Sequence, residues 1–579
     1  MAIICSLRLL LLFALLFGHG VFELEASHQI YHTLQNLDDF DAKTTQPYRT
    51  AYHFQPSKNW MNDPNGPMIY KGIYHLFYQY NPKGAVWMWG SIVWAHSTST
   101  DLVNWTPQSV AIYPSQPSDS NGTWSGSATI FPDGTPAMLF TGVNTLGQQV
   151  QNLAMPKNTC DPYLLEWVKS PSNPVMAPTR ENHINASSFR DPTTAWLCAD
   201  GRWKVVIGSK INRKGVAYLY TSEDFVHWIE AQNLFHSAED TGMWECVDFF
   251  PVSVNSSVGV DLQMLRSNIK YVFKASLDDT KHDYYTVGEY DHVKNVYTPD
   301  EGSVDGDSGL RYDYGKFYAS KTFFDSARNR RILWGWVNES SSVTADIKKG
   351  WSGIQAIPRT IWLDKSGKQL VQWPIQEIEK LRTNAVRLPG KILKKGSVLE
   401  VPGVTAAQAD VEITFNVSDF STGEVLDPSW TNPQLLCCQK GASVKGSLGP
   451  FGLLVLASES LQEYTAVFFR IFKGKNKYVV LMCSDQSRSS LNPDNDKTTY
   501  GAFVDVDPVH EQLSLRSLID HSVVESFGGQ GKSCMTARVY PTFTVKEDAP
   551  AHLYVFNNGS ESVTITRLSA WSMKKAKIN

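Results

Sequence analysis

Residues 99–105 read STDLVNW, and the same arrangement returns as SEDFVHW at residues 222–228. A related stretch, DPYLLEW at residues 161–167, falls between them, so the three tryptophans are 62 and 61 positions apart. Short β-rich runs bounded by turn residues fill the period, such as YHLFYQY at residues 74–80. A period of this size with several short strands is typical of the four-stranded blades of a β-propeller.

The first domain is predicted to contain five such periods, one for each propeller blade. They occupy roughly 310 residues, beginning near Tyr48 and ending close to Trp362, and we place the propeller at residues 48–385. The alternative is that three Asp-hydrophobic-Trp turns recurred by chance. In a propeller the innermost strands converge on one central opening, so side chains far apart in the sequence meet there.

The remainder of the chain has a different pattern. A short helix is expected at residues 374–381, and Pro389-Gly390 interrupts the chain after it. Apolar residues then alternate with other residues, as in Val411, Ile413 and Phe415, which favours an antiparallel β-sandwich at residues 396–575. The predicted fold is therefore all-β, a five-bladed β-propeller followed by a C-terminal β-sandwich.

Composition narrows the functional classes. The 579 residues exceed what one hydrophobic core usually holds, so two domains are expected. The net charge of -4 gives no sign of the basic surface that nucleic-acid binding needs. Arg8 precedes the apolar run 9–17, and small residues follow near Ala26, so residues 1–26 are predicted to be a secretory signal peptide. No later run has transmembrane length, which predicts a secreted protein without a membrane anchor.

Sequons and cysteines fit a secretory route. Seven Asn-x-Ser/Thr sequons are present, and Asn185 is the least suitable because it lies just before Arg190 and Asp191. The expected glycosylation sites are Asn121, Asn255, Asn338, Asn416 and Asn558. Seven cysteines remain beyond residue 26, and their sparse spacing indicates neither a zinc site nor a disulfide scaffold. One bridge, Cys437 to Cys483, is predicted between two apolar strand candidates, and no metal or cofactor is expected.

Three acidic residues occupy distinctive settings. Asp63 lies in WMNDPNG at residues 60–66, Asp191 in FRDP and Glu245 in WEC. Each setting has an ordinary explanation: turn chemistry, a loop cap and a strand-edge ion pair. However, aromatic residues and Arg190 accompany these acids, as in sugar sites. Retaining glycosidases need two carboxyl groups about 5 to 5.5 Å apart, and blades one, three and four would bring these acids together.

These residues carry a resemblance to a known family. The stretches 60–66, WSGS at 124–127, 189–192, 244–246 and DDTK at 278–281 resemble plant acid invertases of glycoside hydrolase family 32. The chain is most similar to their cell-wall branch together with the related fructan exohydrolases, over essentially everything after the predicted signal peptide. The resemblance implies that Asp63 is the nucleophile of a covalent fructosyl intermediate, Glu245 the general acid and base, and Asp191 a stabiliser of fructose hydroxyls.

The resemblance also implies a sugar-binding shell. Its members are Trp60, Asn62, Gln79, Trp87, Trp124, Ser125 and Arg190. Core packing is the alternative for Trp87 and Trp124. Asp278 and Lys281 correspond to family positions associated with the glucose of sucrose, and their presence favours an invertase; the alternative is a surface ion pair.

Two departures from the family pattern stand out. The stretch WMWGS at residues 87–91 is two residues longer than the usual Trp-Gly-Asn, so the family tryptophan aligns with Trp87 or with Trp89. Val247 stands where cell-wall members usually have proline. Vacuolar enzymes and fructosyltransferases usually have valine at this position.

Three hypotheses follow. The first is a retaining β-fructofuranosidase that hydrolyses sucrose in the apoplast or cell wall, with a proteinaceous inhibitor as a partner at the active-site mouth. The second is a fructan exohydrolase or fructosyltransferase on the same scaffold. The third is a non-catalytic extracellular sugar-binding protein, although none of the three acids is missing.

Overall fold

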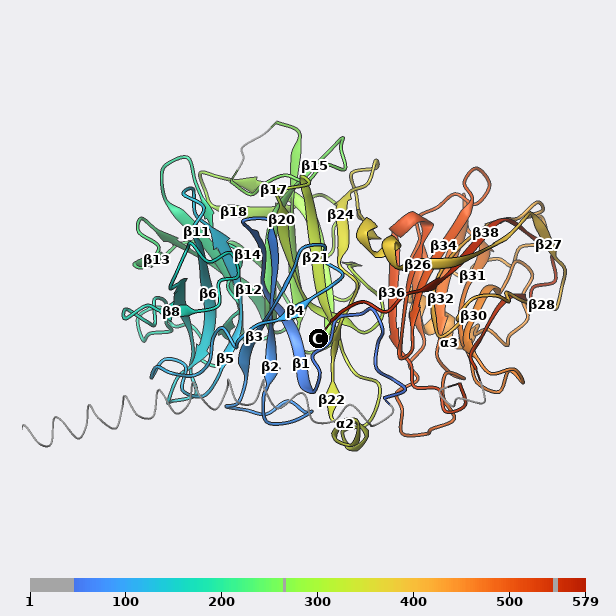
Figure 1. Ribbon diagram of the computed structural model, residues 1–579. Coiled ribbons are helices and arrows are strands. Elements are labelled where there is room, and N and C mark those ends of the chain that lie inside the picture. Colours follow the sequence, from blue (N-terminus) through green and yellow to red (C-terminus); the bar gives the residue numbers. More distant parts are fainter. Residues whose placement is uncertain (1–45, 264–266, 545–549, 579) are drawn as a thin grey trace, which may run out of the picture.

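The computed structural model describes residues 46–263, 267–544 and 550–578. Within these ranges the chain forms seven β-sheets, five in a propeller and two in a sandwich beside it (Figure 1). The predicted signal peptide, residues 1–26, lies outside the described residues. No helix in the described ranges is long and apolar enough to cross a bilayer.

The five propeller blades follow one another along the chain. Blade one contains β1 (Asn59–Tyr70), β2 (Ile73–Asn81), β3 (Val93–Ser99), β4 (Thr106–Pro107) and β22 (Trp351–Ser352), and blade two contains β5 (Thr123–Ile130), β6 (Pro136–Val143), β7 (Gln149–Pro156) and β8 (Trp167–Lys169). Blade three contains β9 (Phe189–Arg190), β10 (Trp196–Leu197), β11 (Trp203–Ile211), β12 (Lys214–Ser222), β13 (Trp228–Glu230) and β14 (His236–Ala238). Blade four contains β15 (Trp244–Ser253), β16 (Ile269–Leu277), β17 (His282–Asp291), β18 (Val296–Pro299) and β19 (Leu310–Arg311), and blade five contains β20 (Phe317–Asp325), β21 (Arg330–Val337), β23 (Ile354–Gln355), β24 (Arg359–Leu363) and β25 (Leu370–Pro374).

The sequence repeat is a structural repeat. Leu102, Leu164 and Phe225 all have positive φ, at 62°, 48° and 68°. The carbonyl of each accepts a hydrogen bond from the indole nitrogen of the tryptophan three residues later, at 3.2, 3.0 and 3.0 Å. The same turn thus leads into the outermost strand of blades one, two and three, which is not what chance recurrence would give.

The propeller ring is closed between its first and last blades. Helix α2 (Val343–Lys349) ends at Gly350, whose φ of 77° is readily adopted by glycine. Strand β22 then pairs in parallel with the start of β1, Asn59 opposite Trp351. A segment that follows β21 in sequence therefore completes the sheet that contains Asp63.

The sandwich consists of two antiparallel sheets with an aliphatic core between them. One sheet contains β26 (Arg382–Leu388), β27 (Lys391–Leu393), β29 (Gln408–Asn416), β34 (Leu513–Asp520), β35 (Val523–Gly528), β36 (Ser533–Arg538) and β38 (Val563–Met573). The other contains β28 (Ser397–Glu400), β30 (Phe451–Ala457), β31 (Thr465–Lys473), β32 (Tyr478–Asp485), β33 (Tyr500–Val504) and β37 (His552–Asn557); a short 3-10 turn, η3 (Gly529–Gly531), follows β35.

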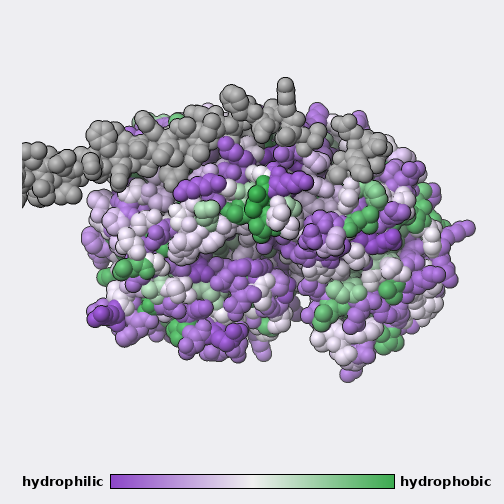
Figure 2. Space-filling model, turned by 90° about the horizontal axis from the view of Figure 1, so that it is seen from below, coloured by the Kyte–Doolittle hydropathy of each residue, from purple (hydrophilic) through white to green (hydrophobic). Residues whose placement is uncertain are grey.

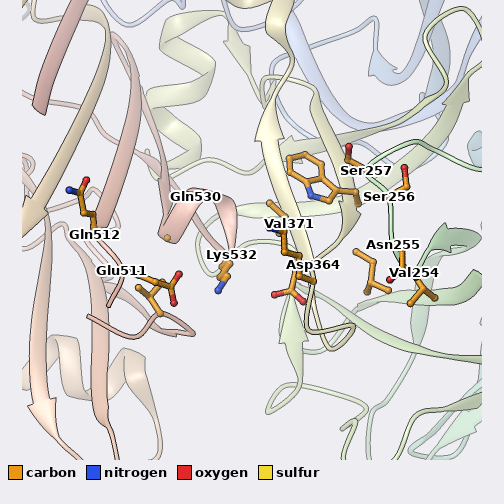
Figure 3. A pocket seen from close by; sticks show the side chains of 15 residues that line it. Val254, Asn255, Ser256, Ser257, Asp364, Val371, Glu511, Gln512, Gln530 and Lys532 are labelled. Atoms are coloured by element: carbon orange, nitrogen blue, oxygen red, sulfur yellow. The ribbon is translucent and has the colours of Figure 1, made fainter. Parts of the chain in front are cut away.

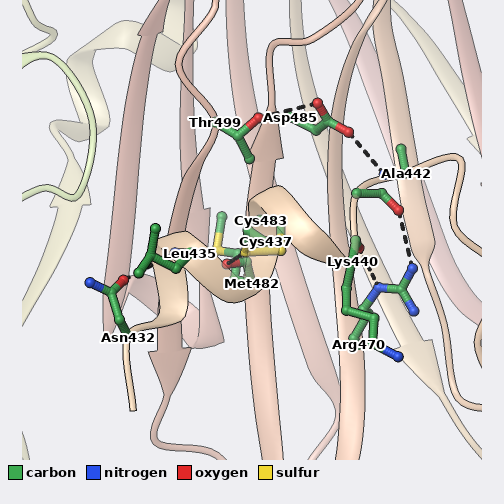
Figure 4. Close-up of a disulfide and its surroundings, with 11 residues drawn as sticks. Asn432, Leu435, Cys437, Lys440, Ala442, Arg470, Met482, Cys483, Asp485 and Thr499 are labelled. Atoms are coloured by element: carbon green, nitrogen blue, oxygen red, sulfur yellow. Dashed lines mark hydrogen bonds between the residues drawn. A yellow bond between two sulfur atoms is a disulfide. The ribbon is translucent and has the colours of Figure 1, made fainter. Parts of the chain in front are cut away.

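Helix α3 (Pro433–Gln439) lies against the second sheet of the sandwich. A disulfide joins its Cys437 to Cys483 on β32, the pair expected from the sequence (Figure 4). The other cysteines of the described ranges are free thiols. Two of them, Cys160 and Cys438, are exposed.

The predicted boundary between the domains is wrong at one point. The expected short helix is present as the 3-10 helix η2 (Gln376–Leu381), but β26 follows it at once and pairs with β38 of the sandwich. Residue 385, predicted to end the propeller, therefore lies inside a sandwich strand. The alternation in residues 382–388 is interrupted by a bulge between Thr383 and Val386, which obscured the strand in the sequence.

The interface between the domains contains a buried ionic network. Arg359 on β24 donates to Asp313 at 2.8 Å and to Glu525 on β35 at 2.7 Å. His53 bridges Glu525 and Asp520, each at 2.9 Å. The side chains of all five residues are fully buried.

Removal of Arg359 should destabilise the protein strongly, because two buried carboxylates would lose their cation. We expect Arg359→Met to lower the free energy of unfolding by about 3 to 5 kcal/mol, measured by urea titration. Lys157→Met provides the matched control, since Lys157 and Glu166 form an ion pair at 61% and 62% exposure and should contribute less than about 1 kcal/mol. Equal unfolding midpoints for the two variants would contradict the assignment.

Candidate active site

Irregularities in the innermost strands mark the site. The pairing register shifts between Met61 and Pro64 on β1 and between Trp124 and Gly126 on β5. It shifts again between Glu245 and Asp248 on β15, and between Tyr318 and Lys321 on β20. A β-bulge re-aims side chains that a regular strand would point at the neighbouring sheet. Four of the five blades thus have an irregular innermost strand at or next to a candidate site residue.

Asp63 is held by donors from three segments. Ser125 donates to Oδ2 at 2.6 Å, the amide of Asn62 donates to Oδ1 at 3.1 Å, and the thiol of Cys246 lies 3.4 Å from Oδ2. Gln79 in turn donates to the Ser125 hydroxyl at 2.5 Å. Burial and the negative charge of Asp191 raise the pKa of Asp63 to about 7, against the lowering effect of the Ser125 hydrogen bond. The surroundings fix the direction of this carboxyl group.

Asp191 lies beside Asp63 in a strained backbone position. Its φ is 67°, its backbone N–H donates to Thr141 at 2.8 Å, and only 3% of its surface is exposed. Its Oδ2 accepts the backbone N–H of Cys246 at 2.8 Å, which ties blade three to blade four. Burial raises the pKa of Asp191, although the Arg190 guanidinium opposes the shift. A non-glycine residue at positive φ is typical of functional sites.

Glu245 receives cationic and phenolic donors. Arg190 donates to Oε1 at 2.9 Å, and Lys281 lies 3.5 Å from Oε2. The hydroxyl of Tyr318 also donates to Oε2. The side chain remains 18% exposed, whereas Asp191 is buried.

Asp278 and Lys281 extend this cluster outward. Arg190 reaches Asp278 at 3.3 Å, and Lys281 hydrogen-bonds Asp278. Their side chains are 38% and 49% exposed. The two residues are thus connected to Glu245 through shared cations and line the outer side of the site, which goes beyond an isolated surface ion pair.

Two buried lysines lie beneath the acids. Lys274 donates to the carbonyl of Cys246 at 2.8 Å, and Lys321 donates to the carbonyls of Val247 and Pro192 at 3.1 and 3.3 Å. Together they fix the backbone next to Glu245 and Asp191 and place positive charge under the carboxylates. Among the described residues, no group of His, Cys, Asp and Glu could hold a metal ion.

The tryptophans divide into two groups. Trp60 and Trp124 are half-buried, and in the described part of the chain their indole nitrogens have no hydrogen-bond partner. Trp87 is 43% exposed, and Trp89, rather than Trp87, lies 5.1 Å from the Trp124 ring. Trp244, in contrast, is fully buried in the propeller core, because neighbouring residues of a strand point to opposite faces.

Sequence reasoning missed Tyr318. A signal for it was present, since an aromatic residue is the first or second residue of the innermost strand in several blades and is followed by a residue of the site. The pairs are Trp124-Ser125, Phe189-Arg190, Trp244-Glu245 and Phe317-Tyr318. The thiol of Cys246 was also missed as a partner of Asp63.

The expected glycosylation positions differ in exposure. Asn255 and Asn416 are exposed, whereas Asn121, Asn338 and Asn558 are half-buried. The amide of Asn121 donates to the carbonyl of Asn144 at 2.7 Å. Modification of these residues stays a prediction.

A cavity of about 620 Å³ lies between the two domains, away from the three acids. Figure 3 shows Asp364 from the propeller and Lys532 from the sandwich facing it from opposite sides. Asn255 also lines it. From below, a notch in the outline separates the two lobes (Figure 2). Asp63, Asp191, Glu245 and Asp278 do not line this cavity.

The assembled site has the parts that a double displacement needs. A carboxylate oriented by a hydroxyl, Asp63, lies close enough to Asp191 and Glu245 for each charge to raise its pKa. Glu245, with its exposed edge, is placed to exchange a proton with a ligand. The positive charges of Arg190, Lys281 and the buried lysines stabilise the three carboxylates at short range.

Loss of the Ser125 hydroxyl should change the pH dependence of activity. That hydroxyl stabilises the ionised form of Asp63, so Ser125→Ala should raise the pKa of Asp63 further. A nucleophile reacts as the anion; the acidic limb of the kcat/KM profile is therefore expected to move to higher pH by about one unit. Ser127→Ala is the control, because Ser127 donates to the carbonyl of Pro192 instead. If the acidic limb of the Ser125→Ala profile does not move, Ser125 does not stabilise the ionised form of Asp63.

Comparisons with known proteins agree with this geometry. Residues 53–374 match the N-terminal domain of glycosyl hydrolases family 32, and residues 377–572 match the C-terminal domain of that family. The insoluble β-fructofuranosidase isoenzyme CWINV1 of Arabidopsis thaliana is 62% identical over 100% of this chain and 99% of its own length. A fructan 6-exohydrolase of Beta vulgaris is 63% identical over 95% of this chain and 89% of its own length. The crystal structure of fructan 1-exohydrolase IIa from Cichorium intybus superposes with a TM-score of 0.90 at 53% identity, covering 92% of this chain and 99% of that one, and a Glu-to-Gln variant of that enzyme was solved in complex with 1-kestose.

Proposed function

The chain belongs to glycosyl hydrolase family 32, and we propose that it is a retaining β-fructofuranosidase that hydrolyses sucrose to glucose and fructose. The observation that carries this proposal is the shared environment of Asp63 and Glu245. One carboxyl group is oriented by Ser125 and Cys246, and the other receives donors at an accessible edge. Such a pair supplies a nucleophile and an acid.

In the first step, an oxygen of Asp63 attacks the anomeric carbon of the fructosyl unit. The bond from that carbon to the glucosyl oxygen breaks, and Glu245 gives its proton to the departing oxygen. The products are glucose and an ester between Asp63 and fructose. In the second step, Glu245 takes a proton from water, the water oxygen attacks the same carbon, and fructose leaves Asp63 as the carboxylate.

Asp191 is proposed to hold fructose hydroxyls at the bottom of the site. Its carboxyl group is buried beside Asp63, and its Oδ2 accepts the Cys246 N–H, so Oδ1 is the oxygen that we propose for a fructose hydroxyl. Asn62 and Gln79 would add amide contacts, and Trp60 an apolar wall. Arg190 would keep Glu245 in place through both steps.

Asp278 and Lys281 are proposed to bind the glucose leaving group. Both are partly exposed and connect to Glu245, which must lie next to the leaving oxygen. We expect Asp278→Ala to lower kcat/KM for sucrose about tenfold and to change kcat/KM for a fructan less than about threefold. Initial rates on sucrose, levan and inulin measure this, with Asp279→Ala as a neighbouring control. A uniform loss on all substrates would contradict a role in leaving-group choice.

A fructan exohydrolase is the second candidate, favoured by the identity with the Beta vulgaris and Cichorium intybus enzymes. Chromatography of products after incubation with sucrose, levan and inulin separates the two. Glucose and fructose from sucrose support the proposal. Fructose released from a fructan with sucrose untouched would replace it by the second candidate, and transfer products would indicate a fructosyltransferase.

Location and partners are part of the proposal. The similar enzymes named as insoluble or cell-wall isoenzymes support placement in the cell wall or apoplast. We also propose that a proteinaceous inhibitor can cover the mouth of the site. Activity in a salt extract of cell walls, and its loss on addition of such an inhibitor, would test both points.

A further inference from the structure

Three consecutive apolar side chains project from the loop between β2 and β3. Trp87, Met88 and Trp89 are 43%, 44% and 50% exposed. The rings of Trp87 and Trp89 lie 6.0 Å apart at an interplanar angle of 67°. Exposed apolar residues that gather in one place are typical of binding surfaces, and indole faces suit the apolar faces of sugar rings.

The loop that carries these rings is fastened at both ends. Asn81 donates from its amide to the carbonyl of Val86 at 2.6 Å, and its Oδ1 accepts the hydroxyl of Ser91 at 2.9 Å. The same hydroxyl lies 2.9 Å from the carbonyl of Met88, so its one proton is shared between the two acceptors. Gly90, at a φ of 76°, makes the turn between them. The tryptophans are therefore held outward by a closed set of contacts.

The loop is continuous with the nucleophile. The Trp89 ring meets the Trp124 ring at 5.1 Å in an edge-to-face contact. Trp124 is followed by Ser125, which donates to Asp63. Gln79, two residues before Asn81, donates in turn to Ser125. A ligand that reaches from Asp63 along Trp124 toward solvent would meet Trp89 next.

The direction of a bound substrate follows from burial. Asp191 is 3% exposed, so the fructosyl unit that is transferred must lie at the closed end. Only the leaving group extends toward the exposed rim, where Asp278 and Lys281 on blade four are proposed to take its first ring. The Trp89 ring lies against Trp124 of blade two and is 50% exposed, so it lines the rim on a different blade from Asp278 and Lys281. A single glucosyl ring bound at Asp278 would leave this second position on the rim empty.

We propose that Trp87 and Trp89 form a platform for the second sugar ring of the leaving group, so that the protein binds a trisaccharide whose leaving group is a disaccharide more tightly than it binds sucrose. This inference rests on the proposed β-fructofuranosidase function. The platform makes Trp89 a determinant of substrate length, separate from the chemistry at Asp63 and Glu245.

Binding to an inactive variant tests the platform. In the Asp63→Asn background, calorimetry with sucrose and with 1-kestose gives two dissociation constants. We expect 1-kestose to bind about 3- to 10-fold more tightly, the range that one aromatic contact provides. Adding Trp89→Ala should weaken 1-kestose more than sucrose, so that the two constants come within about twofold of each other. Trp89→Phe should keep part of the difference.

The controls separate the outcomes. Tyr163→Ala removes an aromatic residue that is 46% exposed in the turn before β8, and it should leave the ratio unchanged. Equal weakening of both sugars by Trp89→Ala would overturn the proposal, because Trp89 would then only support Trp124. Equal affinity of the two sugars before that substitution would also overturn it. Failure of both sugars to bind would instead overturn the proposed function and the platform with it.

Discussion

Asp63→Asn is expected to reduce kcat for sucrose by about 10⁵-fold or more, because no other group can form the covalent bond to fructose. Such a loss corresponds to about 7 kcal/mol of transition-state stabilisation. Asparagine keeps the size of the side chain, and Ser125 and Cys246 can still contact it at Oδ1 or Nδ2. Initial rates at saturating sucrose measure the effect.

The same variant should not lose stability. Burial and the charge of Asp191 raise the pKa of Asp63 to about 7, well above the value of an unfolded aspartate. Above about pH 7 the buried carboxylate is ionised and costs stability; as pH falls from about 7 to about 4 the native state binds a proton that the unfolded state lacks, so the cost disappears. Asp63→Asn should therefore unfold at a higher temperature than the wild type above about pH 7, and the difference should vanish below about pH 4.

These two measurements distinguish chemistry from folding. An inactive variant with a lowered unfolding temperature at every pH would point to a structural role for Asp63. Substantial turnover by a well-folded variant would exclude Asp63 as the nucleophile.

Glu245→Gln should have the second-largest effect, a loss of about 10³- to 10⁴-fold in kcat for sucrose, because the glucosyl oxygen would leave without a proton. The amide retains the shape that Arg190 and Tyr318 contact. An aryl β-fructofuranoside, whose leaving group is already a weak base, should lose far less in the step that forms the fructosyl ester. Presteady-state release of the aryl group measures that step.

A second readout identifies the base role of Glu245. Hydrolysis of the ester needs a base for water but not for an anion, so added azide should restore turnover of the aryl substrate in Glu245→Gln and yield fructosyl azide. Equal losses on sucrose and on the aryl substrate, with no rescue, would contradict the assignment.

Much of the fold could be predicted because its units repeat. The turns ending at Trp105, Trp167 and Trp228 are local, and each is written in adjacent residues. The boundary near residue 385 was misplaced because strand β26 is defined by its pairing with β38, far along the chain, and not by its own pattern. Local patterns predict local turns, whereas long-range pairing is invisible in a single sequence.

The site was predictable where residues lie in distinctive stretches. The structure brings Asp63, Asp191 and Glu245 together, as expected from their blades. Tyr318 was missed because its partner Glu245 is 73 positions away and tyrosine in a strand is common. Trp244, the aromatic neighbour of Glu245 in the sequence, is turned into the core by strand alternation.

The pairing of β22 with β1 has a consequence for biosynthesis. A ribosome releases the strand with the nucleophile first, but its partner at Trp351 emerges only after β20 and β21 of blade five have been made. Nascent chains that stop before that point would leave Asn59 and Trp60, at the start of the strand that carries Asp63, without their parallel partner and open to chaperones and aggregation. Closure of the propeller ring therefore comes late during translation, after residues 351 and 352 have left the ribosome.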